Sequence, residues 1–282
     1  MAPDDALDRP PAGYGYGPPP SPVRPAKRRL PVRPSPVFGA LVAVMVGAGA
    51  YLWTEGQAVS TPMRVAVFVF VAVGWTVSLC VHEFAHAATA WKGGDRSVEG
   101  RGYLTLDPRR YMDRQLSIVL PIIIVLIGGI GLPGGAVMID RRFIPSRGRR
   151  SLVSAAGPLT NLAFALACAA PIQFGWLQGH EALRWALAFL SFLEIAATIL
   201  NALPIPGLDG FGVIAPWLPD ETVAALMPIS QYAFFGIFIL LFYSVKANTA
   251  FFRFVFHAAA VIGVPQQLAE GGMLLFRVWQ HY

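Results

Sequence analysis

The feature that most constrains this chain is a series of apolar stretches, each close to the length that crosses a lipid bilayer as a helix. A spanning helix needs roughly 20 predominantly apolar residues. The stretches lie at 36–53, 64–91, 115–132, 151–173, 184–204, 223–244 and 250–264. Only 13% of the residues are charged, whereas a soluble domain has about 25%. The sequence therefore predicts an all-α polytopic membrane protein with about six transmembrane helices.

Basic residues indicate how these helices are oriented. They cluster before the first stretch, between residues 92 and 114 and between residues 141 and 150, whereas the loops 54–63 and 174–183 have none. Because cytoplasmic loops carry the excess of Lys and Arg, we expect the three clusters to face the cytoplasm. The net charge of +6 is thus a topology signal and does not indicate nucleic-acid binding. The stretch 115–132 has basic flanks on both sides, which favours a small re-entrant helix and strand element.

The composition divides the chain into two regions. Residues 1–35 are rich in Pro and Gly, lack hydrophobic periodicity and are predicted to form a disordered cytoplasmic tail. The basic end of this tail suits contact with anionic membrane lipid. Residues 36–282 are predicted to form one membrane-embedded domain.

One apolar stretch ends in three ionisable side chains within a single helical turn: His82, Glu83 and His86. In a helix, residues i and i+4 lie on one face, so both imidazoles can reach one tetrahedral metal ion. Glu83 is placed to reach a water on that ion without being a ligand. Ionisable groups are costly inside a bilayer, which favours a functional site over a pair of histidines hydrogen-bonded to neighbouring helices.

A catalytic zinc site needs a third protein ligand and an open position. None of the other three histidines is expected at the same depth, which favours a carboxylate. Asp209 follows the helix that returns to the cytoplasmic side, and the prolines and glycines around it break that helix. From spacing alone, a metal ligand and a solvated aspartate at a helix end are equally good interpretations of Asp209. Glu194 is the alternative carboxylate.

Three motifs resemble the site-2 protease family of intramembrane zinc metalloproteases: HEFAH at 82–86, SAAGPLTNL at 154–162 and NALPIPGLDG at 201–210. The segment 100–113 also resembles the family's cytoplasmic hairpin, and the resemblance covers about residues 64–215. It implies that His82, His86 and Asp209 bind one Zn²⁺, that Glu83 is the general base, and that Asn201 binds the oxyanion or the substrate backbone. Nothing in the chain resembles a PDZ insert or a pair of CBS domains, so we expect a minimal form of the protease.

The resemblance implies a metalloprotease that cleaves the transmembrane segment of a single-pass membrane protein, such as an anti-sigma factor or a signal-peptide remnant. We expect it in the bacterial inner membrane, with its active site toward the cytoplasm. Residues 134–140 are the predicted strand edge for an unwound substrate. A catalytically inactive scaffold that binds transmembrane helices is the alternative function. Five histidines in total are too few for a membrane di-iron desaturase.

Overall fold

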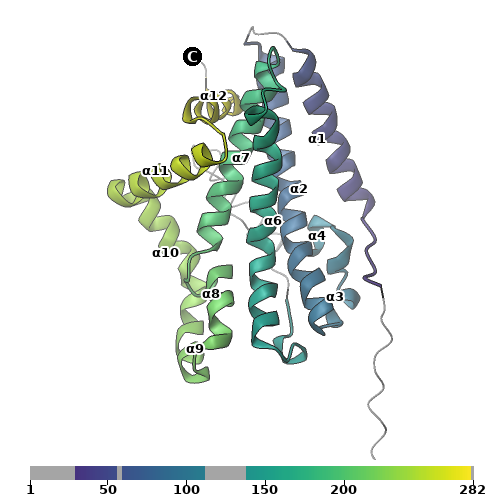
Figure 1. Cartoon of the computed structure of the whole chain (residues 1–282), viewed down its shortest axis with the longest axis vertical. Coiled ribbons are helices and arrows are strands. Elements are labelled where there is room, and N and C mark those ends of the chain that lie inside the picture. Colours follow the sequence, from purple (N-terminus) through teal and green to yellow (C-terminus); the bar gives the residue numbers. More distant parts are fainter. Residues whose placement is uncertain (1–28, 56–58, 112–137, 281–282) are drawn as a thin grey trace, which may run out of the picture. The chain divides into compact units, whose positions relative to one another are not determined.

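All regular elements in the described part of the chain are helices, as the sequence predicted. The computed structural model describes residues 29–55, 59–111 and 138–280, of which 31 onward belong to one compact unit (Figure 1). The tail to residue 28 lies outside the described residues, as do the predicted re-entrant stretch 115–132 and residues 134–137 of the predicted strand edge. These three expectations therefore stay predictions.

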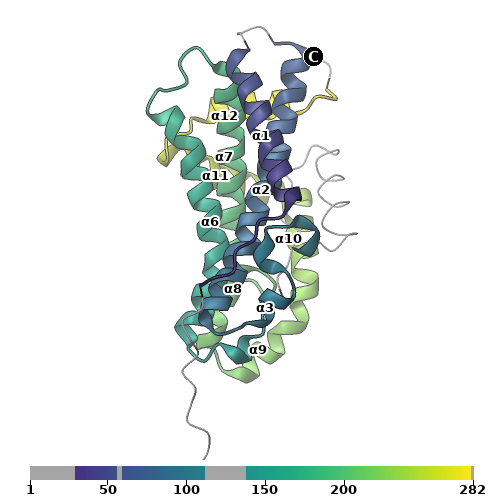
Figure 2. The same cartoon turned by 90° about the vertical axis from the view of Figure 1, so that its right-hand side faces the viewer.

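Within the described residues, four helices are long and apolar enough to cross a membrane. They are α1 (Pro36–Thr54), α2 (Thr61–Gly93), α6 (Arg147–Gln173) and α7 (Glu181–Asn201). They run along the long axis of the domain in both views (Figures 1 and 2). A fifth candidate consists of α11 (Val245–Val261) and α12 (Gln266–Phe276), which meet at a bend of 115°. The predicted count of about six remains a prediction, because part of the chain lies outside the described residues.

Local sequence signals set the ends of the first two long helices. Ser35 and Ser60 precede α1 and α2, and their hydroxyls accept hydrogen bonds from the backbone N–H three residues on. A proline follows in the first turn of each helix, where its missing N–H costs no helical hydrogen bond. Helix α2 ends at Gly93 and is capped by Gly94, whose φ of 131° is strained for other residues.

The stretch 223–244, expected to span the membrane as one helix, is divided in the structure. It forms α9 (Asp220–Leu226), the 3-10 turn η4 (Met227–Ile229) and α10 (Ser230–Tyr243). At 14 residues, α10 is shorter than the roughly 20 residues that a spanning helix needs. Pro228 lies at the break, where it cannot donate a backbone hydrogen bond.

The segment after α2 forms short helical elements, namely α3 (Ser97–Gly100), η1 (Tyr103–Thr105) and α4 (Pro108–Tyr111). Asp95 is fully buried beneath them and accepts hydrogen bonds from the backbone and the hydroxyl of Ser97. Its other oxygen accepts the backbone N–H of Asp140 at 2.8 Å. Asp95 thus ties the chain that leaves α2 to the chain that enters α6.

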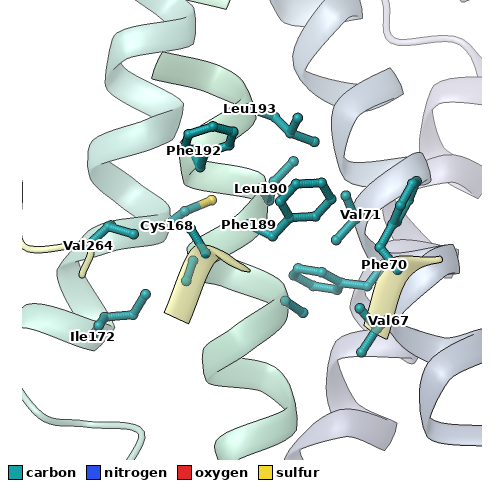
Figure 3. Close-up of a cluster of buried hydrophobic side chains, with 14 of the residues drawn as sticks. Val67, Phe70, Val71, Cys168, Ile172, Phe189, Leu190, Phe192, Leu193 and Val264 are labelled. Carbon is teal, nitrogen blue, oxygen red and sulfur yellow. The ribbon is translucent and has the colours of Figure 1, made fainter. Parts of the chain in front are cut away.

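Helix α7 is the most enclosed of the four long helices, with 72% of its apolar window buried. Its neighbours α2 and α6 contribute apolar side chains to a common core (Figure 3). The residues labelled there are Val67, Phe70, Val71, Cys168, Ile172, Phe189, Leu190, Phe192, Leu193 and Val264. Helix association in lipid depends on close packing, because lipid tails are as apolar as the side chains.

Gly272 tests this packing at the contact between α12 and α7. A Cβ at this position would overlap the carbonyl oxygen of Trp185 and lie 2.6 Å from the Cβ of Phe189. We expect Gly272→Ala to lower stability by about 1–3 kcal/mol, because the two backbones would have to separate. Thermal unfolding in detergent, followed by circular dichroism, measures the effect.

Gly271→Ala is the matched control, because a Cβ there would meet the Trp185 ring at an ordinary 3.4 Å. The control should melt at or above the wild-type temperature, since alanine favours a helix more than glycine does. Equal melting of both variants would show that the approach of α12 to α7 does not limit stability.

Candidate metal centre

Two histidines of α2 lie buried in the bundle with their rings held by a neighbouring helix. His82 Nδ1 lies 2.6 Å from the side-chain oxygen of Asn161, and His86 Nδ1 lies 2.7 Å from the backbone carbonyl of Val153. Both acceptors belong to α6. An amide or carbonyl oxygen can only accept a hydrogen bond, so each Nδ1 carries the proton. The lone pair of each ring is therefore left on Nε2.

The third group of the centre comes from the short helix α8 (Asp209–Ile214). Asp209 is its first residue, and its carboxylate oxygens lie 3.2 Å from His82 Nε2 and 3.3 Å from His86 Nε2. The close return of the chain depends on Gly210, where a Cβ would overlap the carbonyls of Ala202 and Leu203 at the end of α7. Spacing alone left Asp209 open between a ligand and a solvated side chain, and the family resemblance implied a ligand. The structure places Asp209 with both histidines.

The separations of these atoms fit a tetrahedral ion. The two Nε2 atoms are 3.1 Å apart, and metal-binding atoms of all three residues lie within 4.8 Å of one another. Ligands at about 2.0–2.1 Å from a tetrahedral zinc would be about 3.3 Å apart. Two lone pairs and an anionic oxygen at such distances repel one another unless a cation lies among them. The donor set therefore fits Zn²⁺.

Gly157 of α6 leaves the space that such an ion needs. A Cβ at this position would overlap Nε2 of both His82 and His86. Because residue 157 is glycine, helix α6 has no Cβ against these two Nε2 atoms. The adjacent Pro158 lies inside the same helix and is buried.

The charge of Asp209 also suits a cation. An aspartate side chain is ordinarily an anion at neutral pH. A largely buried anion is costly unless it is paired or binds a metal.

The two predicted catalytic residues, Glu83 and Asn201, are both buried. Glu83 follows His82 in α2 and is 4% exposed. Asn201 is the last residue of α7 and is 6% exposed. Its amide nitrogen has no hydrogen-bond partner within the described ranges. A buried donor without a partner is costly, which favours a role in binding another molecule.

Glu194, the alternative third ligand, lies apart from the metal-binding group. It is fully buried in α7, and its carboxyl accepts a hydrogen bond from the hydroxyl of Ser78 at 2.7 Å. Within the described part of the chain, the group that could hold a metal consists of His82, His86 and Asp209. The structure therefore favours Asp209 over Glu194.

Two residues of α6 complete the site although they are not ligands. Asn161 bonds across the helix interface and orients the ring of His82. Gly157, whose role the sequence pattern did not reveal, leaves room at the Nε2 atoms of both histidines. The two positions are four residues apart and so lie on one face of the helix, which is the sequence signal that they share a neighbour.

Known proteins similar to this chain carry zinc protease names. A Mycobacterium tuberculosis protein named "Putative zinc metalloprotease Rip2" is 46% identical over 252 residues, which are 89% of this chain and 96% of that protein. The protein of the same name in Mycolicibacterium smegmatis is 42% identical over 91% of this chain and 98% of its own length. "Putative zinc metalloprotease YwhC" of Bacillus subtilis is 30% identical over 61% of this chain and 80% of its own length.

Searches with family models and against solved structures found no match. The relatives and the group of two histidines and an aspartate together support Zn²⁺ as the metal. The relatives also support a metalloprotease function, and the apolar helices support a membrane protein.

Gly157→Ala tests whether α6 must leave the open side of the two histidines clear. We expect this variant to lose most of its bound zinc, because the new methyl group would overlap both Nε2 atoms. Metal content of the purified protein, measured by mass spectrometry, gives the answer. Gly148→Ala in the first turn of α6 is the control and should keep its zinc, since its Cβ would meet only Ser146 at 3.9 Å. Full zinc in Gly157→Ala would contradict the assignment.

Asn161→Ala tests the orientation of His82. We expect zinc affinity to fall by about 10–100-fold, as for other groups that orient a metal ligand. Competition with a chromophoric chelator measures the affinity. Asn201→Ala is the contrast: it should keep wild-type zinc affinity and lose cleavage activity. The assignments of these two asparagines would be wrong if the two results were exchanged.

Proposed function

Because the chain belongs to the site-2 protease family, we propose that it hydrolyses peptide bonds within the membrane-spanning segments of single-pass membrane proteins. The single observation that carries this proposal is the meeting of His82, His86 and Asp209 inside the helical bundle. Both histidines lie on a helix of 33 residues that is apolar enough to cross a membrane. A hydrolytic centre at such a position acts on substrates that are themselves in the membrane.

The proposed mechanism gives each residue one role. A zinc ion held by His82, His86 and Asp209 would lower the pKa of water to near 7 and would polarise the carbonyl of the scissile bond. Glu83 accepts the proton of the attacking water and passes it to the leaving amine. The Nδ1 hydrogen bonds of His82 and His86 hold their rings with Nε2 toward the centre.

We assign substrate binding to Asn201. Its buried amide nitrogen lacks a partner within the described residues and can donate to a carbonyl oxygen or to the developing oxyanion. A substrate helix hides its peptide bonds in its own hydrogen bonds, so it must unwind before it is cleaved. Donors such as Asn201 replace part of the hydrogen bonding that unwinding removes.

The segment 134–140 remains the proposed edge that receives the unwound substrate. The described end of this segment is firmly tied to the protein. The carbonyl of Met138 accepts a hydrogen bond from Arg101 at 2.6 Å, and the N–H of Asp140 binds Asp95. These contacts support a fixed position for residues 138–140.

We propose that the site opens toward the cytoplasm of a bacterial cell, at the inner membrane. His82 and His86 lie in the C-terminal half of α2, toward the basic segment 92–110. In Figures 1 and 2, α3 lies at the end of the bundle with α8 and α9, far from α12. Basic residues mark cytoplasmic ends, which supports this orientation. An anti-sigma factor or a signal-peptide remnant is the proposed class of substrate.

Glu83→Gln tests the proposed mechanism. We expect the variant to keep its zinc, because the three ligands remain, and to lose cleavage by on the order of 10²–10⁴-fold, because the general base is lost. The measurements are metal content and cleavage of a transmembrane peptide in detergent. Glu221→Gln, an exposed glutamate of α9, is the control and should cleave normally. Wild-type cleavage by Glu83→Gln would remove Glu83 from the mechanism.

A further inference from the structure

A cavity of about 560 Å³ opens beside α11, at the bend where this helix meets α12. It is lined by Thr249, Phe252, Arg253, Phe256, His257, Ala260 and Gln266. This set of residues is separate from the metal centre and from both predicted catalytic residues. Its volume lies in the range of small-molecule sites.

The lining combines a polar stripe with an aromatic floor. Thr249, Arg253 and His257 are spaced by four residues and therefore lie along one face of α11. Phe252 and Phe256 form the adjacent stripe and are half-buried. The ring of Phe256 packs at 4.5 Å on that of Phe192 in α7, which makes the floor part of the bundle.

Arg253 is a cation without a counter-ion in this setting. It is exposed, and it makes no hydrogen bond or ion pair with any residue in the described ranges. The nearby carboxylate of Glu270 on α12 accepts a hydrogen bond from Gln266 at 2.7 Å, and it is not part of the lining. An arginine next to aromatic rings and without a carboxylate favours an anionic group from outside the chain.

The surroundings point to a lipid as the source of this anion. Phe254 and Val261 of α11 are 59% and 72% exposed, and Val245 at its start is 79% exposed. Such apolar surfaces on a membrane protein are covered by acyl chains. A ligand with a phosphate for Arg253 and an apolar chain for the phenylalanines matches both parts of the cavity.

We propose that this cavity binds an anionic phospholipid, with its phosphate on Arg253 and His257 and an acyl chain on Phe252 and Phe256. Arg253 supplies charge and up to two parallel N–H donors. His257 adds one donor, and the Thr249 hydroxyl can donate another. A zwitterionic lipid would leave the arginine charge unbalanced and should bind less well.

The test uses the full chain in dodecyl maltoside with equal amounts of phosphatidylglycerol and phosphatidylcholine of the same acyl chains. Native mass spectrometry counts the bound lipids. We expect one retained phosphatidylglycerol per chain, and about tenfold weaker retention in Arg253→Gln. Phe252→Ala should also weaken retention, whereas Arg253→Lys should keep part of it.

Lys246→Gln is the matched control, because it removes an exposed cation from the same helix outside the cavity. It should change retention by less than about twofold. Equal loss in Lys246→Gln and Arg253→Gln would reduce the effect to general electrostatics and overturn the proposal. Circular dichroism of each variant checks that the helices are intact.

Three further outcomes would overturn the lipid assignment. Equal retention of both lipids would contradict a preference for anionic lipid. Displacement of the lipid by an equal concentration of glycerol phosphate would assign the site to a soluble phosphate. A lipid-free dimer that resists dissociation would assign the cavity to a second copy of the chain.

Discussion

The structure depends on holding three metal-binding side chains together inside an apolar bundle. The Nε2 atoms of His82 and His86 and the carboxylate of Asp209 are 3.1–3.3 Å apart. Polar groups buried in this way are costly unless they are hydrogen-bonded or bind a metal. The rest of the fold must therefore hold the two histidines of one helix next to an aspartate that lies 123 residues after His86 in the chain.

Helix α6 meets most of this demand although it contributes no metal ligand. Asn161 and the carbonyl of Val153 fix both imidazole rings from one side. Between them in sequence, Gly157 keeps the Nε2 atoms clear. One turn earlier, Ser154 lies where a Cβ on Gly212 of α8 would overlap its hydroxyl, so α8 also rests directly on α6. A single helix thus aligns the elements that carry the ligands.

Helix α7 connects the centre to the outer part of the domain. It ends at Asn201, close in sequence to the break that turns the chain into α8, and it is the most enclosed long helix. Glu194 ties it to Ser78 on α2, one helical turn before His82. On its other face, Phe192 supports the aromatic floor of the α11 cavity. A ligand in that cavity would therefore contact Phe256, which packs on α7, and α7 is the helix that ends at Asn201.

The sequence by itself determined the helical class, four long helices and the pairing of His82 with His86, because helical periodicity fixes which residues share a face within one helix. Spacing alone left both Asp209 and Glu194 possible as the third ligand. The resemblance of NALPIPGLDG to the family motif favoured Asp209, and the structure shows that Asp209 returns to the histidines. The sequence also could not assign a role to Gly157 or predict that the stretch 223–244 is divided into separate helical elements. Those outcomes depend on how closely two helices approach and where the chain turns back. Only tertiary packing decides such distances, because they join residues that no local periodicity relates.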